Sequence, residues 1–327
     1  MGKKQNKISL TGHACGGRVI RTTGGAYEVR RADGQVITCM VKGNFRIKGI
    51  RTTNPVAVGD MVTAVQATDH IWYITNIEPR RNYIIRRASN LSKESHILAA
   101  NIDKAFLVVT LREPEVPLTF IDRFLATAEA YRIPTSIILN KADRLEPDDK
   151  ELVDAFSYLY QSIGCPVLTV SAVTGLGLDA LRDATKDNIS LLAGNSGVGK
   201  STLINALIPG ANLRTGEISD LYHTGTHTTT FSEMLQLPYG GEIIDIPGVR
   251  SFGTIDFTVE DTSHFFPEIF RESHKCKYSD CRHVNEPGCA VLEAVADHRI
   301  AQSRYASYLS ILDEVKAGSA DKYRKPF

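Results

Sequence analysis

Residues suited to phosphate chemistry occur in one run, Gly194-Asn195-Ser196-Gly197-Val198-Gly199-Lys200-Ser201. The run fits G-x-x-x-x-G-K-[ST], and the apolar segment Ile189–Ala193 before it is typical of a strand. In such loops glycines turn backbone N–H groups toward phosphates, the lysine reaches the β- and γ-phosphates, and the serine ligates Mg²⁺. The expected helix Lys200–Leu207, which includes Thr202, points its positive end at the anion. We predict a nucleotide-binding loop; a Gly-rich turn is the alternative, and a chance match occurs in about one such chain in a hundred.

A second polar set, Asn140-Lys141-Ala142-Asp143, follows the apolar segment Thr135–Leu139 and matches N-K-x-D. The Asp143 carboxylate can accept hydrogen bonds from the ring N–H and the exocyclic amine of guanine, while Lys141 would lie along the base. Adenine lacks that donor pair, so the motif favours GTP or GDP over the nucleotide of an ATP-dependent kinase or ATPase. Ser171-Ala172, after the next expected strand, resembles the short motif that supports the base through a backbone N–H. A solvated loop is the alternative for Asn140–Asp143, because a four-residue pattern recurs by chance in a few per cent of chains.

Two further segments are predicted to complete the Mg²⁺ and γ-phosphate contacts. Residues 245–248 fit D-x-x-G, in which Asp245 would hold Mg²⁺ through water and the Gly248 N–H would contact the γ-phosphate. This pattern is expected about once by chance in such a chain, so its weight comes from its place after the phosphate loop. In the Thr-rich segment 224–230 we favour Thr229 over its two neighbours as a Mg²⁺ ligand, with a Thr-rich strand entrance as the alternative. The predicted Mg²⁺ ligands are Ser201, Thr229 and Asp245.

The residue directly after D-x-x-G bears on hydrolysis. Many GTPases carry a glutamine there to orient the attacking water, but this chain has Val249, which cannot do so. We therefore expect slow intrinsic hydrolysis, with Lys200 holding the phosphates. His227 is the candidate catalytic group, because an imidazole can orient or deprotonate water near neutral pH. A surface histidine without a catalytic role is an equal alternative.

Three of the six cysteines fall within fourteen residues, with a histidine among them. The spacing Cys276-x₄-Cys281-x-His283-x₅-Cys289 offers three thiolates and one imidazole, a ligand set of closed, structural Zn²⁺ sites. His274 could substitute for His283, but Cys-x-His within the loop suits chelation better. We predict one structural Zn²⁺ on these four ligands; free cysteines with an incidental histidine are the alternative.

The elements that must position these residues fall into three parts. β-type runs at 17–22, 26–31, 36–41, 60–66 and 72–77 alternate with Gly and Asp turns, which predicts an OB-type β-barrel followed by a basic connector at 80–100. From residue 102 strands alternate with helices, which predicts an α/β domain with a parallel sheet. The chain from about 257 onward is expected to be mainly helical. The predicted domains are therefore a basic OB-type barrel at 1–80, a P-loop GTPase domain at 81–254 and a helical zinc-binding domain at 255–327.

The order of the motifs is unusual, because N-K-x-D and Ser171-Ala172 precede the phosphate loop and D-x-x-G follows it. Most GTPases begin with the phosphate loop, so the central domain is predicted to be circularly permuted. With these motifs, the segment His227-Thr228-Thr229-Thr230, the barrel and the cysteine cluster, nearly the whole chain resembles the RsgA (YjeQ) family of circularly permuted GTPases. The resemblance implies a zinc site with this ligand set, a role for His227 in hydrolysis, and action on the bacterial small ribosomal subunit during its late maturation. A related permuted GTPase serving the large subunit matches the barrel and cysteine cluster less well.

The charge distribution favours a polyanionic partner. Residues 1–87 hold 15 Lys and Arg against 5 Asp and Glu, whereas the remainder holds 23 against 32. A solvated basic face is the alternative, but the resemblance implies the small ribosomal subunit and its rRNA as partners, with turnover stimulated by the subunit. We expect a cytoplasmic monomer without a membrane partner, since the sequence has no long apolar run and no signal-peptide pattern. A GTP-gated rRNA-binding module in which hydrolysis is incidental remains the alternative function.

Overall fold

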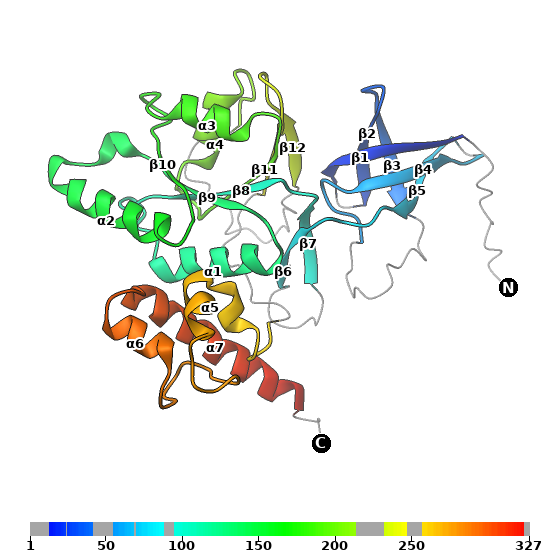
Figure 1. The fold of residues 1–327 in the computed structure, drawn as a ribbon. Helices are drawn as coiled ribbons and strands as arrows, with labels where there is room; N and C mark the ends of the chain where they lie inside the picture. Colours follow the sequence, from blue (N-terminus) through cyan, green and yellow to red (C-terminus); the bar gives the residue numbers. More distant parts are fainter. Residues whose placement is uncertain are drawn as a thin grey trace, which may run out of the picture. The chain divides into compact units, whose positions relative to one another are not determined.

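The computed structural model describes residues 13–23, 25–41, 55–68, 70–87, 95–213, 232–246 and 257–323, and Figure 1 shows their secondary structure. The chain forms two compact units. The first contains Met1–Asp103, Thr185–Leu192 and Glu217–Gly248, and the second contains Lys104–Ala184, Ala193–Gly216 and Val249–Phe327. Within the described ranges, no helix is both long and apolar enough to cross a membrane. The three predicted domains, 1–80, 81–254 and 255–327, stay a prediction.

The first unit contains a closed barrel of five strands: β1 (Ala14–Thr22), β2 (Ala26–Arg31), β3 (Val36–Val41), β4 (Met61–Gln66) and β5 (Trp72–Ile77) (Figure 1). Neighbouring strands pair in the order β1-β2-β3-β5-β4, and β4 also pairs with β1, which closes the barrel. Side chains alternate along each strand, so Val19, Val29 and Ile74 fill the interior and are fully buried. The predicted OB-type barrel is confirmed, and β2, β3 and β5 have the predicted bounds.

The basic connector predicted at 80–100 contains an antiparallel pair of strands, β6 (Tyr83–Arg87) and β7 (Ser95–Ala100). The barrel turn approaches β7 closely at Gly59, where φ is +94° and a Cβ would lie 2.0 Å from the Ala100 carbonyl oxygen. Only glycine allows both the left-handed conformation and this approach. Close by in the chain, Arg80 forms a buried bidentate ion pair with Asp60, at 2.6 and 2.7 Å. The basic connector thus contains two strands that the sequence did not predict.

Three more strands belong largely to the first unit: β11 (Ile189–Ala193), β12 (Glu233–Gln236) and β13 (Glu242–Asp245). β11 and β13 are parallel, and Leu192 lies opposite Asp245 in their register. β12 runs antiparallel to β13 and also pairs with the barrel strand β1. β11 has the predicted bounds, whereas β12 is too short for its pattern to have predicted it.

The second unit contains the parallel strands β8 (Lys104–Val109), β9 (Thr135–Leu139) and β10 (Val167–Thr169), in the order β10-β9-β8. The helices that accompany them are α1 (Leu118–Ala130), α2 (Lys150–Gln161), α3 (Leu178–Thr185) and α4 (Lys200–Leu207). Phe106, Leu107 and Ile137 are fully buried, as expected for strands covered on both faces. Strands alternating with helices confirm the predicted α/β domain.

The C-terminal part of the second unit is helical, with η3 (Thr262–Phe265), α5 (Pro267–Ser273), α6 (Ala290–Ala296) and α7 (Gln302–Tyr323). α7 packs against α1 through a fully buried ion network. Arg304 of α7 donates to Asp122 of α1 at 2.8 Å and to Glu268 of α5 at 2.7 and 3.2 Å. The Tyr160 hydroxyl also donates to Asp122, at 3.1 Å. Buried charges are costly unless paired, so this network ties α7 to the parallel-stranded part of the unit.

Candidate nucleotide site and metal centre

The predicted phosphate loop lies between β11 and α4, in the strand–loop–helix context that the motif requires. Gly194, Gly197 and Gly199 all have positive φ angles, of +148°, +82° and +93°. A Cβ at Gly194 would lie 2.4 Å from the Val108 carbonyl oxygen, so a larger residue would displace the end of β8. Lys200 curls over this loop and donates to the carbonyls of Gly194 and Asn195, at 2.7 and 2.8 Å. Its amine is therefore held at the centre of the loop, beside the first turn of α4 with Ser201 and Thr202.

Asn140 connects the base-reading motif to the phosphate loop. Its buried side-chain amide donates to the Val198 carbonyl oxygen at 2.8 Å. A Cβ at Gly199 would lie 2.4 Å from the Asn140 Nδ2 atom, so the loop needs a glycine where the asparagine packs. The structure thus brings together two motifs that are separated by 58 residues along the chain.

Asp143 and Ser171, which the sequence placed in separate motifs, are in direct contact. The Ser171 hydroxyl donates to the Asp143 carboxylate at 2.5 Å, and it accepts from the Thr174 N–H at 3.1 Å. Asp143 lies in the short helix η1 (Ala142–Arg144), which Lys141 precedes in a left-handed conformation with φ +61°. The Ala142 N–H also donates to the Val170 carbonyl at 3.0 Å, next to Ser171-Ala172. One oxygen of the exposed Asp143 carboxylate is thereby oriented by a buried hydroxyl.

A segment without a recognised motif also contacts both nucleotide motifs. This β8–α1 loop, residues 110–117, places the Pro114 ring 3.4 Å from the position of a Cβ on Gly197. The Glu113 carbonyl accepts a hydrogen bond from Lys141 Nζ, and the Glu113 carboxylate accepts one from Arg144 at 2.5 Å. Burial lowers the pKa of Lys141, as does the neighbouring Arg144 cation, while Glu113 raises it. In the sequence, only the prolines after β8 indicate a loop here, and they do not indicate a function for it.

The predicted Mg²⁺ residues are described only in part. Asp245 ends β13 opposite Leu192 of β11, and Leu192 precedes Gly194 by two residues. Because parallel strands end at the same edge of a sheet, Asp245 lies where the chain leaves β11 toward the phosphate loop. The other predicted site residues, His227, Thr229 and Gly248, lie outside the described residues, as do Thr228, Thr230 and Val249.

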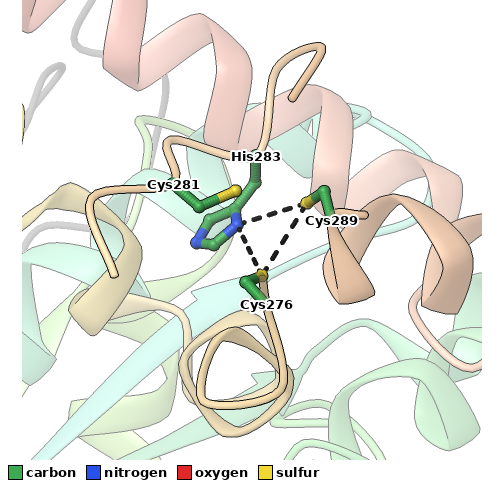
Figure 2. Close-up of side chains that lie close together, drawn as sticks. All are labelled: Cys276, Cys281, His283 and Cys289. Atoms are coloured by element: carbon green, nitrogen blue, oxygen red, sulfur yellow. Dashed lines mark hydrogen bonds between the residues drawn. The ribbon is translucent and has the colours of Figure 1, made fainter. Parts of the chain in front are cut away.

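The four predicted metal ligands converge on one point, as Figure 2 shows. The sulfur atoms of Cys276, Cys281 and Cys289 and the ring of His283 lie within 4.8 Å of one another. His283 Nδ1 lies 3.6 Å from the Cys276 sulfur and 3.4 Å from the Cys289 sulfur. A tetrahedral Zn²⁺ with usual bond lengths requires ligand separations of about 3.5–3.8 Å. The donor set and its spacing therefore fit a structural zinc ion, with Nδ1 as the imidazole ligand atom.

The protonation of two of these ligands is linked to metal binding. Burial, with added effects of Cys289 and Cys276, raises the pKa of Cys281 to about 12, so a metal ion that binds there has to displace the thiol proton. Burial also lowers the pKa of His283, which favours the neutral imidazole that binds metal. His283 and Cys289 are each 2% exposed, whereas Cys276 and Cys281 are half-buried.

The carboxylate of Glu286 orders the backbone between these ligands. It accepts from the N–H groups of Arg282 at 3.0 Å, Val284 at 2.8 Å and Asn285 at 3.1 Å. Desolvation opposes its ionisation, but these backbone donors outweigh that effect and lower the pKa of Glu286 to about 2. The carboxylate is consequently ionised near neutral pH and able to hold the loop.

Two tyrosines of α7 hold the opposite polar groups of the same backbone. The Tyr305 hydroxyl donates to the His283 carbonyl and the Tyr308 hydroxyl to the Arg282 carbonyl, both at 2.7 Å. His283 itself has a φ of +58°, an uncommon conformation for a residue with a side chain. Hydrogen bonds from the tyrosines and to Glu286 therefore hold this loop in shape independently of any bond to a metal. Sequence reasoning found the ligands but not Glu286, Tyr305 and Tyr308, because no spacing rule connects them to the cluster.

Comparisons with known proteins agree along nearly the whole chain. The family model for the RsgA GTPase matches residues 77–255, and the model for the RsgA N-terminal domain matches residues 16–74. A protein from Bacteroides fragilis named small ribosomal subunit biogenesis GTPase RsgA is 54% identical, over 95% of this chain and 99% of its own length. A protein of the same name from Porphyromonas gingivalis is also 54% identical, over 95% of this chain and 99% of its own length.

Two solved structures share this architecture. YjeQ from Thermotoga maritima has a TM-score of 0.73 at 33% identity and covers 93% of this chain and 99% of its own. YloQ, described as a circularly permuted GTPase, has a TM-score of 0.68 at 30% identity and covers 96% of this chain and 97% of its own. The fold, the order of the motifs and these matches define a circularly permuted GTPase with an N-terminal barrel. The chain belongs to the RsgA GTPase family, and it is a GTP hydrolase of that family.

Proposed function

We propose that this chain hydrolyses GTP to GDP and phosphate in the late maturation of the small ribosomal subunit. The contact between Asn140 and Val198 carries the proposal, because it joins the base-reading motif to the phosphate loop. The names of the relatives from Bacteroides fragilis and Porphyromonas gingivalis support the ribosomal role. Slow intrinsic turnover follows from Val249 in the position where many GTPases carry glutamine. The basic N-terminal segment and the names of these relatives support stimulation of turnover by the subunit.

Each nucleotide motif has a proposed role. Asp143 accepts hydrogen bonds from guanine, Lys141 lies along the base, and the Ser171-Ala172 segment supports Asp143 and the base. The phosphate loop cradles the phosphates, and Lys200 neutralises the charge that develops during transfer. Mg²⁺, when bound, supplies Lewis-acid neutralisation of the β- and γ-phosphates. The proposed contacts to the phosphates and to Mg²⁺ come from Gly194, Asn195, Ser196, Gly197, Val198, Gly199, Lys200, Ser201, Thr202, Thr229, Asp245 and Gly248, with His227 as the proposed group that orients water.

The cysteine cluster is proposed to bind one structural Zn²⁺. The convergence of Cys276, Cys281, His283 and Cys289 within 4.8 Å supports this assignment. The four protein ligands would complete a tetrahedral shell and leave no open position for chemistry. The role of the metal is therefore to fold the segment between α5 and α6.

The basic N-terminal segment is proposed to contact rRNA. Residues 1–87 contain 15 Lys and Arg but only 5 Asp and Glu, which supports a phosphate-rich partner. We further propose a cytoplasmic monomer with no membrane partner, divided into a barrel at 1–80, a GTPase domain at 81–254 and a zinc-binding domain at 255–327. Sedimentation of the purified chain tests the monomeric state.

Two measurements test the nucleotide specificity and the ribosomal role. Wild-type protein should bind GTP with much higher affinity than ATP. The affinity of Asp143→Asn for GTP should fall at least about tenfold, while its affinity for xanthosine triphosphate should rise. Asp148→Asn, an exposed neighbour, is the matched control. GTP turnover should rise when purified small subunits are added but not with large subunits. Equal rates with and without small subunits would exclude the activation.

The alternative is a GTP-gated rRNA-binding module in which hydrolysis is incidental, and the strongly basic N-terminal segment is the observation in its favour. Nucleotide-dependent co-sedimentation with each subunit, followed by complementation of a depleted strain, separates the two functions. A variant that binds GTP and subunits but cannot hydrolyse GTP should fail to complete maturation if the enzyme function is correct. Full complementation by that variant would favour the binding module.

A further inference from the structure

The β8–α1 loop, residues 110–117, is held in a defined shape at the edge of the nucleotide motifs. The Thr110 hydroxyl donates to the Pro114 carbonyl at 2.5 Å, and the Val116 N–H donates to the Thr110 carbonyl at 3.2 Å. Arg112 forms an ion pair of 2.6 Å with Asp149 in η2 (Pro147–Asp149), just after the base-reading motif. These bonds fix the tip of the loop, where Glu113 adopts a left-handed conformation with φ +49°.

Glu113 contacts the two cations of the base-reading segment through different groups. Its carbonyl accepts from Lys141 Nζ, so the side chain of Lys141 is anchored at the end that would flank the nucleoside. Its carboxylate accepts from Arg144, whose guanidinium is half exposed. Without the carboxylate, two cations three residues apart would repel each other at the tip of the loop.

The same loop contacts the phosphate loop through the next residue, Pro114, at Gly197. Loop 110–117 therefore contacts the base-reading motif through Glu113 and the phosphate loop through Pro114. A residue at this junction can set how well the nucleoside fits without contacting the bond that is broken.

We propose that Glu113 is a positioning residue for the nucleoside half of the site: it holds Lys141 and Arg144 in place and so sets the affinity for guanine nucleotides. This inference rests on the proposed binding of guanine by Asn140–Asp143. Because the contacts lie on the base side, GTP and GDP are affected alike, and the chemical step is not.

The test compares two charge reversals that differ only in position. Glu113→Lys should raise the dissociation constants of fluorescent GTP and GDP analogues by about three- to tenfold, because it replaces an ion pair with like charges. Glu115→Lys carries the same change of net charge two residues away; among the described residues, Glu115 makes no side-chain hydrogen bond or ion pair, and it should leave both constants unchanged. For Glu113→Lys, KM should rise with kcat unchanged. High salt should reduce the difference in dissociation constants between Glu113→Lys and Glu115→Lys, because it screens the charges. A purely structural role would instead lower the melting temperature or kcat.

A charge swap completes the test. The double variant Glu113→Lys with Arg144→Glu should recover most of the lost affinity, whereas Arg144→Glu alone should resemble Glu113→Lys. Equal constants for Glu113→Lys and Glu115→Lys, in protein that still prefers GTP to ATP, would overturn the positioning role alone. Wild-type protein with no preference for GTP would overturn the guanine assignment and this inference with it.

Discussion

The phosphate loop, residues 194–199, and the metal loop, residues 276–289, both direct several polar atoms toward one point, but they are stabilised differently. The phosphate loop relies on glycines with positive φ, and Ser196 and Gly197 at its tip are exposed. The metal loop relies on other side chains, since Glu286 holds its N–H groups while Tyr305 and Tyr308 hold its carbonyls. Two of its four ligands are almost fully buried.

This difference matches the two ligands that the loops are proposed to bind. A nucleotide must enter and leave on each cycle, so its loop stays open and is shaped by backbone conformation that needs no bound group. A structural metal stays in place, so its loop can be enclosed and braced from two sides. Removal of one supporting side chain at a time tests whether the two loops are stabilised independently.

Loss of a metal ligand should have the largest effect. Cys289→Ser should abolish the binding of one zinc per chain and unfold the segment between α5 and α6, because structural zinc contributes on the order of 10 kcal/mol in small zinc-binding peptides. Metal analysis and hydrogen exchange of residues 274–290 measure both outcomes. Cys15→Ser, which alters a barrel cysteine, should retain the metal. A normal zinc content in Cys289→Ser would remove this residue from the ligand set.

The buried ion network that anchors α7 should come next. Arg304→Ala leaves Asp122 and Glu268 buried without a cation, which should cost about 3–5 kcal/mol and lower the midpoint of denaturant unfolding. Arg123→Ala is the matched control, since Arg123 also joins α1 to α7, through the partly exposed Glu314. That control should cost about 1 kcal/mol or less. Similar losses in the two variants would show that burial does not decide the strength of this contact.

Lys200→Ala tests the open loop without touching the enclosed one. GTP turnover should fall about 100- to 1000-fold, the cost of removing one donor from a charge that develops in the transition state. Zinc content and the melting temperature should stay unchanged, because Lys200 donates to the Gly194 and Asn195 carbonyls of the phosphate loop, which contains none of the metal ligands. The exposed Lys186→Ala serves as the control for a lost positive charge. A parallel loss of zinc would contradict the independence of the two loops.

Glu286→Gln should have the smallest effect of the four. An amide retains the size of the carboxylate but presents one N–H₂ group to backbone donors, so the loop is less well ordered for the metal. Zinc affinity, measured by competition with a chelator, should fall about 10- to 100-fold, as for other residues that orient metal ligands. Glu293→Gln, an exposed change on α6, should not alter it. An unchanged affinity in Glu286→Gln would mean that the tyrosines suffice to shape the loop.

Much of the fold follows from local patterns. The bounds of β9, β11 and α4 agree with prediction because apolar periodicity and a phosphate-loop motif act over a few neighbouring residues. β6 was missed because its two arginines interrupt the apolar pattern, and β7 because its apolar residues 97–100 do not alternate with polar ones. β12 was missed because four residues carry too little pattern. Long-range contacts leave no local trace: Arg304 and Asp122 are 182 residues apart.

In the candidate sites, too, some residues could be predicted from local patterns and others could not. Asp143, Lys200 and Cys289 could be found because nucleotide and metal chemistry demand particular residue types at short spacings. Glu113 and Glu286 could not, because a glutamate that supports a loop has no required neighbour in the chain. Their roles depend on which backbone or cation lies beside them after folding.

The sequence alone determined the class of chemistry: guanine and phosphate recognition in a permuted order, and a cysteine–histidine metal site. This was possible because each of these motifs consists of particular residue types at short spacings along the chain. Only the tertiary structure decided how the sets are positioned, through Asn140 on the phosphate loop, Glu113 on Lys141, and Glu286 with two tyrosines on the metal loop. These contacts join residues from separate elements, and their partners are chosen by packing and by the need to pair polar groups, which no short spacing encodes.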